Sequence, residues 1–174
     1  MALNYIRKYP TEQEDLSADF HFSHVWARNK TWEAMEKIRA LKHKMIRWED
    51  DYLEGKQWVL SVDGIHCWIN EPSHPEWSQD PTYYSHKYKK AGLDYELGIS
   101  LVDNRLLWMA GPFPAGTNDI AVFRGKGLRA ELIRRKQKAI GDKGYNGEPK
   151  YVSTFNAHDN AGVRLFKSRA LKLH

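Results

Sequence analysis

The sequence predicts an α/β domain, in which a mixed β-sheet is flanked by helices, with a helical segment before it. Three observations favour this class. The first part of the chain carries apolar residues at helical spacing, short apolar runs typical of strands follow, and helix-like and strand-like stretches then alternate. Strands first and then helices in alternation with strands indicate a sheet with helices packed against it.

Residues 1 to about 50 are predicted to be helical and polar. Thr11, with Glu14 three residues later, forms a capping-box pattern that opens a short helix. A longer helix is expected to begin at Thr31, because apolar residues recur there at helical spacing: Trp32, Met35, Ile38, Leu41, Met45 and Ile46. The opposite face is basic, which fits either contact with DNA or an ordinary amphipathic helix packed on the next domain.

The strands are expected to begin after this segment. The apolar run 58–63 predicts a buried strand, and residues 65–69 either continue it or pair with it. Residues 95–102 and 105–110 are predicted to form a hairpin, with Asp103-Asn104 at its turn. This gives three strands in sequence.

The second half of the domain alternates between helix and strand. A helix is expected from 118 to about 138, interrupted near Gly125 and Gly127. Two further strands and a closing helix are expected at 139–142, 151–154 and 159–174. This is the element order of an RNase H-like fold, a mixed sheet flanked by helices. In that fold the first acidic residue lies on the first strand and a second follows the fourth strand.

Three aspartates occupy the ends or edges of these elements. Asp63 closes the first strand, Asp119 follows the turn-rich stretch 111–118, and Asp142 lies where a short strand runs into a glycine turn. Carboxylates at strand ends can hold Mg²⁺ or Mn²⁺, and a pair of such ions supports in-line displacement at a phosphodiester. Each acid also has a structural interpretation, since Asp119 could cap a helix and Asp142 could stabilise its turn.

The charge balance favours a polyanionic partner. Lysine and arginine outnumber aspartate and glutamate by 27 to 22. The excess is concentrated between residues 124 and 143, whose basic side chains either form a solvated helix face or contact phosphate. The candidate DNA contacts in this segment are Arg124, Arg129, Arg134, Arg135 and Lys143.

Several classes of protein are excluded by composition. The single cysteine, Cys67, excludes an internal disulfide and a cysteine-only metal site. No apolar run approaches the roughly 20 residues that span a bilayer, and the N-terminus lacks the apolar core of a signal peptide. We therefore expect a soluble intracellular protein with no membrane partner.

With these motifs the chain resembles the Harbinger-type DDE transposases, which are related to bacterial transposases of the insertion-sequence-five group. The likeness runs from about Tyr9 to the end of the chain. Three ordered matches to the family's Asp-Gly-Thr-His, Gly-Ser-x-Asp and Gly-Asp-x-Gly-Tyr elements carry it: Val62-Asp63-Gly64-Ile65-His66, Gly116-Thr117-Asn118-Asp119-Ile120-Ala121-Val122-Phe123 and Gly141-Asp142-Lys143-Gly144-Tyr145.

The resemblance implies cut-and-paste DNA transposition in the nucleus, with DNA as substrate and a separate Myb-like DNA-binding protein as a candidate partner. It makes Asp63 the first metal ligand and Asp119 and Asp142 the other acidic positions. The family's motifs often favour Asp119 as the second catalytic acid, whereas the strand order favours Asp142. We keep both and prefer Asp142. Lys87 matches a basic residue of the family and is a candidate phosphate contact, whereas for His66 we favour local hydrogen bonding.

The family's final glutamate is expected just past His174. We therefore expect residues 51–174 to be an RNase H-like DDE nuclease domain that is incomplete at its C-terminus, preceded by the helical segment 1–50 as a candidate DNA-binding element. Two functions follow. One is a metal-dependent DNA endonuclease and strand-transfer domain that acts by a two-metal mechanism. The alternative is a catalytically inactive, transposase-derived DNA-binding or protein-interaction module, so the sequence leaves open whether the chain is an enzyme.

Overall fold

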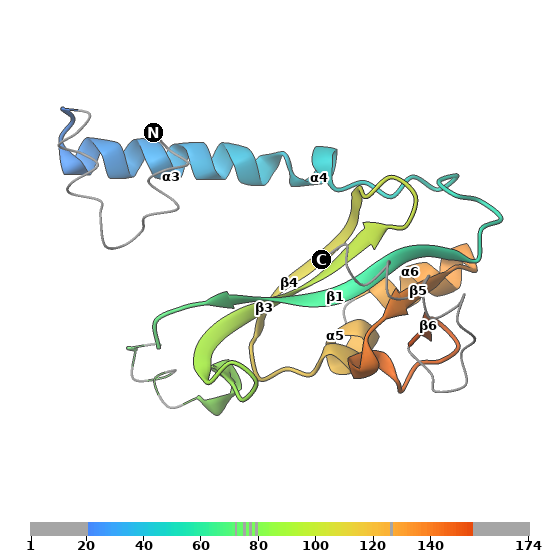
Figure 1. Cartoon of the computed structure of the whole chain (residues 1–174). Coiled ribbons are helices and arrows are strands. Elements are labelled where there is room, and N and C mark those ends of the chain that lie inside the picture. The colour runs from blue at the N-terminus through green and yellow to red at the C-terminus, as the bar shows by residue number, and fades with distance from the viewer. Residues whose placement is uncertain are drawn as a thin grey trace. The chain divides into compact units, whose positions relative to one another are not determined.

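The computed structural model describes residues 21–154, apart from residues 72, 75, 77, 79 and 126. The chain divides into two compact units, one that ends at Met45 and one that begins at Ile46 (Figure 1). The functional division that we place near residue 50 stays a prediction. The short helix expected after Thr11 and the closing helix expected at 159–174 lie outside the described residues.

The first unit is built on helix α3 (His24–Ala40), followed by the short helix α4 (Lys42–Met45). The hydroxyl of Ser23 caps α3 by accepting a hydrogen bond of 3.2 Å from the backbone N–H of Trp26. The expected start at Thr31 is therefore wrong. Thr31 is buried inside the helix and donates its hydroxyl to the carbonyl of Ala27 at 2.8 Å, a bond that a threonine in mid-helix can make.

The second unit contains a six-stranded mixed sheet, which confirms the predicted α/β class and agrees with an RNase H-like fold (Figure 1). The strand order is β2-β3-β1-β5-β6, and β4 also pairs with β3. The central strand β1 runs antiparallel to β3 and parallel to β5. The strands are β1 (Trp58–Trp68), β2 (Tyr84–Ser85), β3 (Lys90–Ser100), β4 (Leu106–Pro114), β5 (Lys138–Gly141) and β6 (Val152–Ser153).

The strand bounds differ from the sequence pattern in several places. β1 is a single strand that continues to Trp68, so residues 65–68 continue the first strand and do not pair with it. β3 begins at Lys90, five residues before the expected start at 95, because this part pairs with β1 and β4. β4 extends to Pro114, so residues 111–114 belong to a strand and not to the expected turn-rich stretch. Prolines are tolerated there because β4 pairs with β3 alone among the described strands, so an edge of β4 needs no N–H donor.

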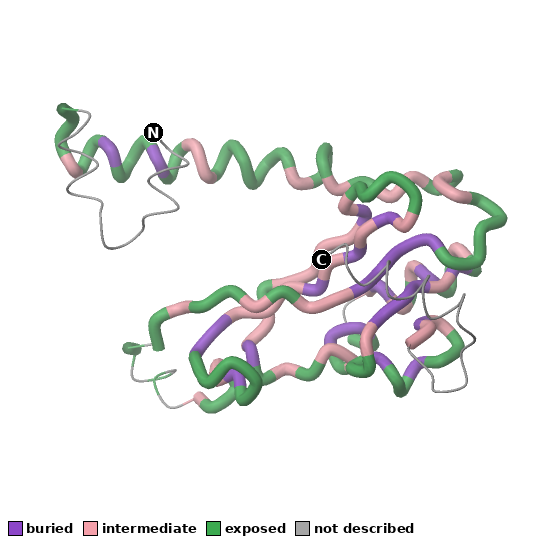
Figure 2. Tube along the Cα trace, in the orientation of Figure 1, coloured by how far each residue is buried: buried purple, intermediate pink, exposed green. Residues whose placement is uncertain are grey.

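Within the described part of the second unit, two helices cover the core. The helices α5 (Asp119–Gly125) and α6 (Leu128–Arg135) are separated near Gly127, as predicted, and Gly127 has a φ of 107° that favours glycine. Figure 2 shows the buried positions along β1 and β5. The buried core comprises Val59, Leu60, Val62, Leu107, Phe123, Leu128, Leu132, Ala139, Tyr145 and Val152.

One core contact links two chain segments that matter for the site. The turn after β5 contains the 3₁₀ helix η2 (Lys143–Tyr145), and a second such turn, η1 (Pro81–Tyr83), precedes β2. The ring of Tyr145 in η2 packs edge-on against Phe123 in α5, with 5.8 Å between ring centroids. This contact holds α5 against the turn after β5.

Within the part of the chain that the structure describes, no helix is long and apolar enough to cross a membrane.

Candidate acidic active site

The sheet register brings Asp63 and Asp142 to the same edge. β1 and β5 are parallel, and their last paired residues are Val62 and Gly141. Asp142 follows the end of β5, whereas Asp63 lies inside β1, which continues to Trp68 and pairs Asp63 with Leu97 of β3. The expectation that Asp63 closes its strand is therefore wrong, because pairing with β3 extends β1 beyond the apolar run. The two aspartates are still neighbours, as the strand order predicted, because each directly follows the last β1–β5 pair.

Asp119 reaches this edge from the first residue of α5. Its carboxylate occupies space that two glycines leave open. A Cβ added to Gly64 would lie 2.8 Å from Oδ1 of Asp119, and one added to Gly144 would lie 2.9 Å from Oδ2 of Asp119 and 2.9 Å from Oδ1 of Asp142. The three sequence motifs therefore meet at the carboxylate of Asp119, and the glycines after Asp63 and Asp142 make room for it.

Local hydrogen bonds orient Asp63 and Asp142. The backbone N–H of Gly64 donates to Oδ1 of Asp63 at 2.8 Å, and that of Gly144 donates to Oδ1 of Asp142 at 2.7 Å. Asp142 thereby caps η2, in agreement with its structural interpretation. Each acid keeps its second oxygen for other partners.

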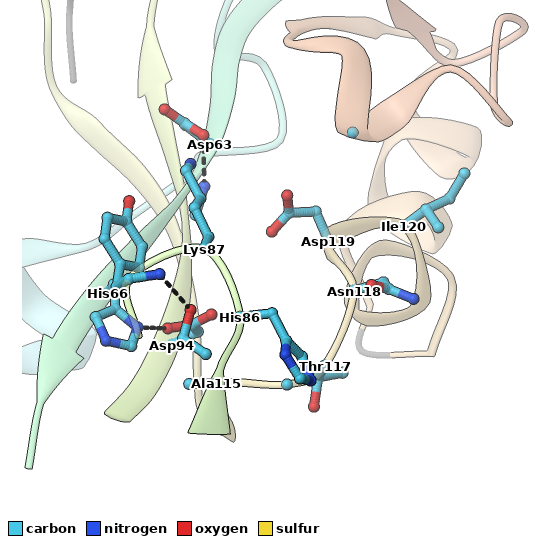
Figure 3. A pocket seen from close by; sticks show the side chains of 15 residues that line it. Asp63, His66, His86, Lys87, Asp94, Ala115, Thr117, Asn118, Asp119 and Ile120 are labelled. Atoms are coloured by element: carbon cyan, nitrogen blue, oxygen red, sulfur yellow. Dashed lines mark hydrogen bonds and ion pairs between the residues drawn. The ribbon is translucent and has the colours of Figure 1, made fainter. Parts of the chain in front are cut away.

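The charges of the cluster act on one another. Burial raises the pKa of Asp119, and the nearby charges of Asp142 and Asp63 raise it further, whereas Lys87 opposes the shift. The pKa of Lys87 is raised first by its interaction with Tyr88 and then by the charges of Asp63 and Asp119. Figure 3 shows Lys87 beside Asp63, with Asp119 across from it. The site therefore concentrates negative charge around Lys87.

A cavity of about 430 Å³ opens over this edge of the sheet (Figure 3). Asp63, Asp119 and Lys87 line it, together with His86 and the loop 115–118 that leads into α5. Asp142 does not line the cavity, although Gly144, to which it is hydrogen-bonded, does. The cavity has the charged, concave character of a site for a polar substrate.

His66 belongs to the wall of this cavity and is held by its neighbours. Its Nδ1 lies 2.6 Å from Oδ1 of Asp94, and its ring stacks on Tyr88 with 4.5 Å between centroids. The side chain is only 4% exposed. This agrees with local hydrogen bonding as the role of His66. Asp94 could not be recognised from the sequence as part of the site, because its position depends on pairing with His66 across β1 and β3.

Glu96 is a second acidic residue near the site that the sequence analysis missed. It lies on β3 opposite Gly64 and is 3% exposed. The indole N–H of Trp108 donates to its Oε2 at 3.0 Å, and burial raises its pKa to about 7. A glutamate at a core-facing position of a strand was the available signal.

The candidate DNA contacts on α5 and the start of α6 are already paired. Arg124 and Arg129 both bind Glu148, with N–O distances of 2.7 Å and 3.2 Å. Arg124 also donates to the carbonyl of Gly147 at 3.1 Å. Since Glu148 follows η2, these pairs tie the helix that begins at Asp119 to the segment after Asp142.

The next two arginines also have partners within the chain. Arg134 pairs with Glu131 and Asp50. The side chain of Arg135 is 6% exposed and donates to the backbone carbonyls of residues 48 and 49, at 2.7 Å each. Arg135 therefore anchors the segment before β1, which leaves it little surface for DNA.

Two lysines remain beside the acids. Lys87 lines the cavity, and Lys143 is exposed in η2, directly after Asp142. Among the described residues, Lys87 and Lys143 can therefore contact a polyanion at the edge that carries Asp63, Asp119 and Asp142. Arg124, Arg129 and Arg135 make contacts within the fold.

The carboxylate oxygens of the three aspartates are the type of ligand that a hard divalent ion prefers. Mg²⁺ and Mn²⁺ prefer carboxylate oxygens, and Gly144 leaves room for the carboxylates of Asp119 and Asp142 to approach each other. Among the described residues, no three His, Cys, Asp or Glu side chains are placed to hold one ion as they stand. Asp63 and Asp142 each turn one oxygen to a backbone N–H.

Comparison with known proteins identifies one family. The family described as DDE superfamily endonuclease matches residues 62–169, more than half of the chain, and the matched part contains Asp63, Asp119 and Asp142. No curated protein and no solved structure matches the chain.

Proposed function

The chain belongs to the DDE superfamily endonucleases, and from this premise we propose that it is a transposase-type nuclease that cuts DNA phosphodiester bonds at the acidic edge. One observation supports this most strongly. The carboxylate of Asp119 lies against Gly64 and Gly144, the residues to which Asp63 and Asp142 are hydrogen-bonded. Three separate chain segments are thereby brought to one point by the fold.

Endonucleases of this superfamily generally use divalent metal ions. In our proposal Asp63, Asp119 and Asp142 hold Mg²⁺ or Mn²⁺, which when bound activates the attacking hydroxyl and stabilises the leaving oxygen. The register supports Asp142 as the neighbour of Asp63, and the glycine contacts support Asp119 as the acid that meets both. We therefore propose that both take part.

The basic residues divide into two groups under this proposal. Lys87 and Lys143 contact the DNA backbone, because they are exposed beside the acids. Arg124 and Arg129 position the acidic edge through Glu148. Lys87 additionally balances the charge of Asp63 and Asp119 before DNA and metal are bound.

The finer assignment rests on the ordered motifs. We propose a Harbinger-type element that acts in the nucleus by cut-and-paste transposition, with strand transfer and a Myb-like DNA-binding partner. The resemblance of the three motifs to those of Harbinger elements supports it.

A second candidate function is a DNA-binding or protein-interaction module derived from such a nuclease. The observation that favours it is the placement of the acids, since no three acidic or histidine side chains of the described residues are arranged around a common point for an ion. In this case the basic residues bind DNA and the acids serve only the fold.

Nicking of a supercoiled plasmid separates the two functions. The full chain is assayed with Mg²⁺, with Mn²⁺ and with EDTA, beside Asp63→Asn and the exposed control Asp51→Asn. A nuclease nicks the plasmid only with metal, loses this activity in Asp63→Asn and keeps it in Asp51→Asn. DNA binding that persists in EDTA and in Asp63→Asn, without nicking by the wild type, supports the module instead.

A further inference from the structure

A second, much smaller cavity lies on the inner side of Asp119. It has a volume of about 10 Å³ and is bordered by Gly64, Glu96, Asp119 and Tyr145, among others. Gly64 and Asp119 line both this cavity and the large one. The Asp119 side chain therefore stands between the two spaces and has polar surroundings on both sides.

Two buried polar atoms at this small cavity have no hydrogen-bond partner among the described residues. They are Oε1 of Glu96 and the hydroxyl oxygen of Tyr145. Glu96 is 3% exposed and Tyr145 is fully buried. Buried polar groups are almost always hydrogen-bonded. We therefore expect these two atoms to share a hydrogen-bond partner.

Glu96 and Tyr145 are neighbours of Gly64 and Gly144, the two glycines that lie against the Asp119 carboxylate. Glu96 is the β3 partner of Gly64, and Tyr145 directly follows Gly144. The environment also keeps Tyr145 a donor, since burial first, and then the charges of Glu96 and Asp119, raise the pKa of its hydroxyl.

We propose that one buried water molecule occupies the small cavity and joins Glu96 and Tyr145 to the carboxylate of Asp119. A volume of about 10 Å³ is close to the minimum that holds one water. A buried water makes about three hydrogen bonds, and Glu96, Tyr145 and Asp119 are among the polar residues that border the space. Glu96 and Tyr145 are then positioning residues, which fix the direction in which Asp119 faces the large cavity.

This inference rests on the proposed function only in its consequence for metal binding. Residues that hold a metal ligand in place typically change metal affinity by 10- to 100-fold when they are removed. The water itself and the orientation of Asp119 are properties of the metal-free protein. They can be measured whether or not the chain is an active nuclease.

The test is a crystal structure of the metal-free full chain at a resolution that shows ordered water. We compare wild type with Tyr145→Phe, which removes only the hydroxyl, and with the matched control Tyr151→Phe. The wild type and the control are expected to show one water within hydrogen-bond distance of Glu96, Tyr145 and Asp119. Tyr145→Phe is expected to lose or displace it and to rotate the Asp119 carboxylate.

Two substitutions of Glu96 distinguish positioning from packing. Glu96→Gln keeps polar atoms at the cavity and is expected to retain the water, whereas Glu96→Met, of similar size and apolar, is expected to lose it. A dry cavity in the wild type overturns the inference, and so does an Asp119 carboxylate with the same orientation in all variants. The wild-type crystal decides the first point even if a variant fails to fold.

Titration with Mn²⁺ on the same samples adds the functional consequence. We expect affinity to fall about tenfold or more in Tyr145→Phe and to stay unchanged in Tyr151→Phe. Affinity equal in the two variants overturns the positioning role. A wild type that shows the water and binds no Mn²⁺ contradicts the proposed function and leaves the water-mediated link in place.

Discussion

The carboxylate of Asp119 lies where a side chain of Gly144 would be, since a Cβ on Gly144 would come within 2.9 Å of its Oδ2. The same Cβ would lie 2.9 Å from Oδ1 of Asp142. This close approach connects the turn after β5 with the start of α5. It also explains why a glycine is required two residues after Asp142, where the backbone φ itself demands none.

Gly144→Ala is therefore expected to disturb the acids more than the fold. The atoms that the new methyl group meets are the ends of two carboxylate side chains, which can move aside at small cost in stability. A displacement of about 1 Å at a catalytic group can lower the rate about 100-fold. We expect plasmid nicking to fall by about this factor, with little change in the melting temperature.

The matched control for this substitution is Gly125→Ala. A Cβ at Gly125 has no neighbour within 4 Å, so this change adds a methyl group to the end of α5 without contact. Its nicking rate is expected to equal that of the wild type. Equal activity of both variants would show that the glycine at 144 does not serve the site.

Glu148 is expected to stabilise the acidic edge through its two arginines. Its side chain is 11% exposed and accepts from Arg124 and Arg129. Glu148→Gln keeps the shape and removes the charge, so we expect a loss of about 2 kcal/mol in the free energy of unfolding, measured with urea. The exposed pair of Arg134 with Asp50 is the comparison, and Arg134→Gln is expected to change stability little.

The contribution of Glu148 to the free energy of unfolding is also expected to depend on pH. The hydrogen bond from Arg124 is the main cause that holds the pKa of Glu148 below its usual value of 4.5. The ion pairs are thus fully present above that value and are lost as the pH falls through the lowered pKa. The stability difference between wild type and Glu148→Gln should shrink in acid, and a difference that grows there would contradict the assignment.

The contribution of Glu96 to the free energy of unfolding is expected to depend on pH in the opposite direction. Burial raises its pKa from 4.5 to about 7, so between these values the folded chain holds a proton that the unfolded chain has lost. Its contribution to stability therefore falls as the pH rises through this window, by at most about 1.4 kcal/mol per pH unit. Urea unfolding of the metal-free wild type and of Glu96→Gln across this range measures it. Identical pH profiles would show that Glu96 titrates normally.

Lys87 is expected to contribute to DNA binding without a role in stability. It is exposed, and its charge faces Asp63 and Asp119 across the cavity. Lys87→Met should weaken DNA binding and reduce the slope of log affinity against log salt by about 1, which is the signature of one phosphate contact. Lys56→Met, at an exposed position before β1, is the control. A salt slope that is the same in both variants would exclude the contact.

The adjacency of Asp63 and Asp142 could be predicted from the sequence. The apolar run before each aspartate indicates a strand, and the element order makes the two strands neighbours. That β1 continues past Asp63 to Trp68 could not be predicted, because it depends on pairing with β3. The extent of β4 could not be predicted, because residues 111–114 carry turn-forming residues and become a strand only by pairing with β3. Tertiary pairing here overrides local propensity.

The roles of Glu96 and Asp94 were also beyond the sequence. Each depends on which residue of β1 lies opposite it, and that register is set by the whole sheet. The partners of the arginines were beyond the sequence for a related reason. A basic run looks like a DNA-binding face until its partners are known, and Glu148 lies far from Arg124 in the sequence. Charge counts do not show which charges the fold already neutralises.

The most direct test of the central claim is calorimetric titration of the metal-free chain with Mn²⁺. The samples are the wild type, Asp63→Asn, Asp119→Asn, Asp142→Asn and the control Asp51→Asn. If the three aspartates form one metal site, the wild type and the control bind Mn²⁺ and each of the three variants loses most of this binding. Binding that survives all three substitutions, or a wild type that binds no Mn²⁺, would contradict the account.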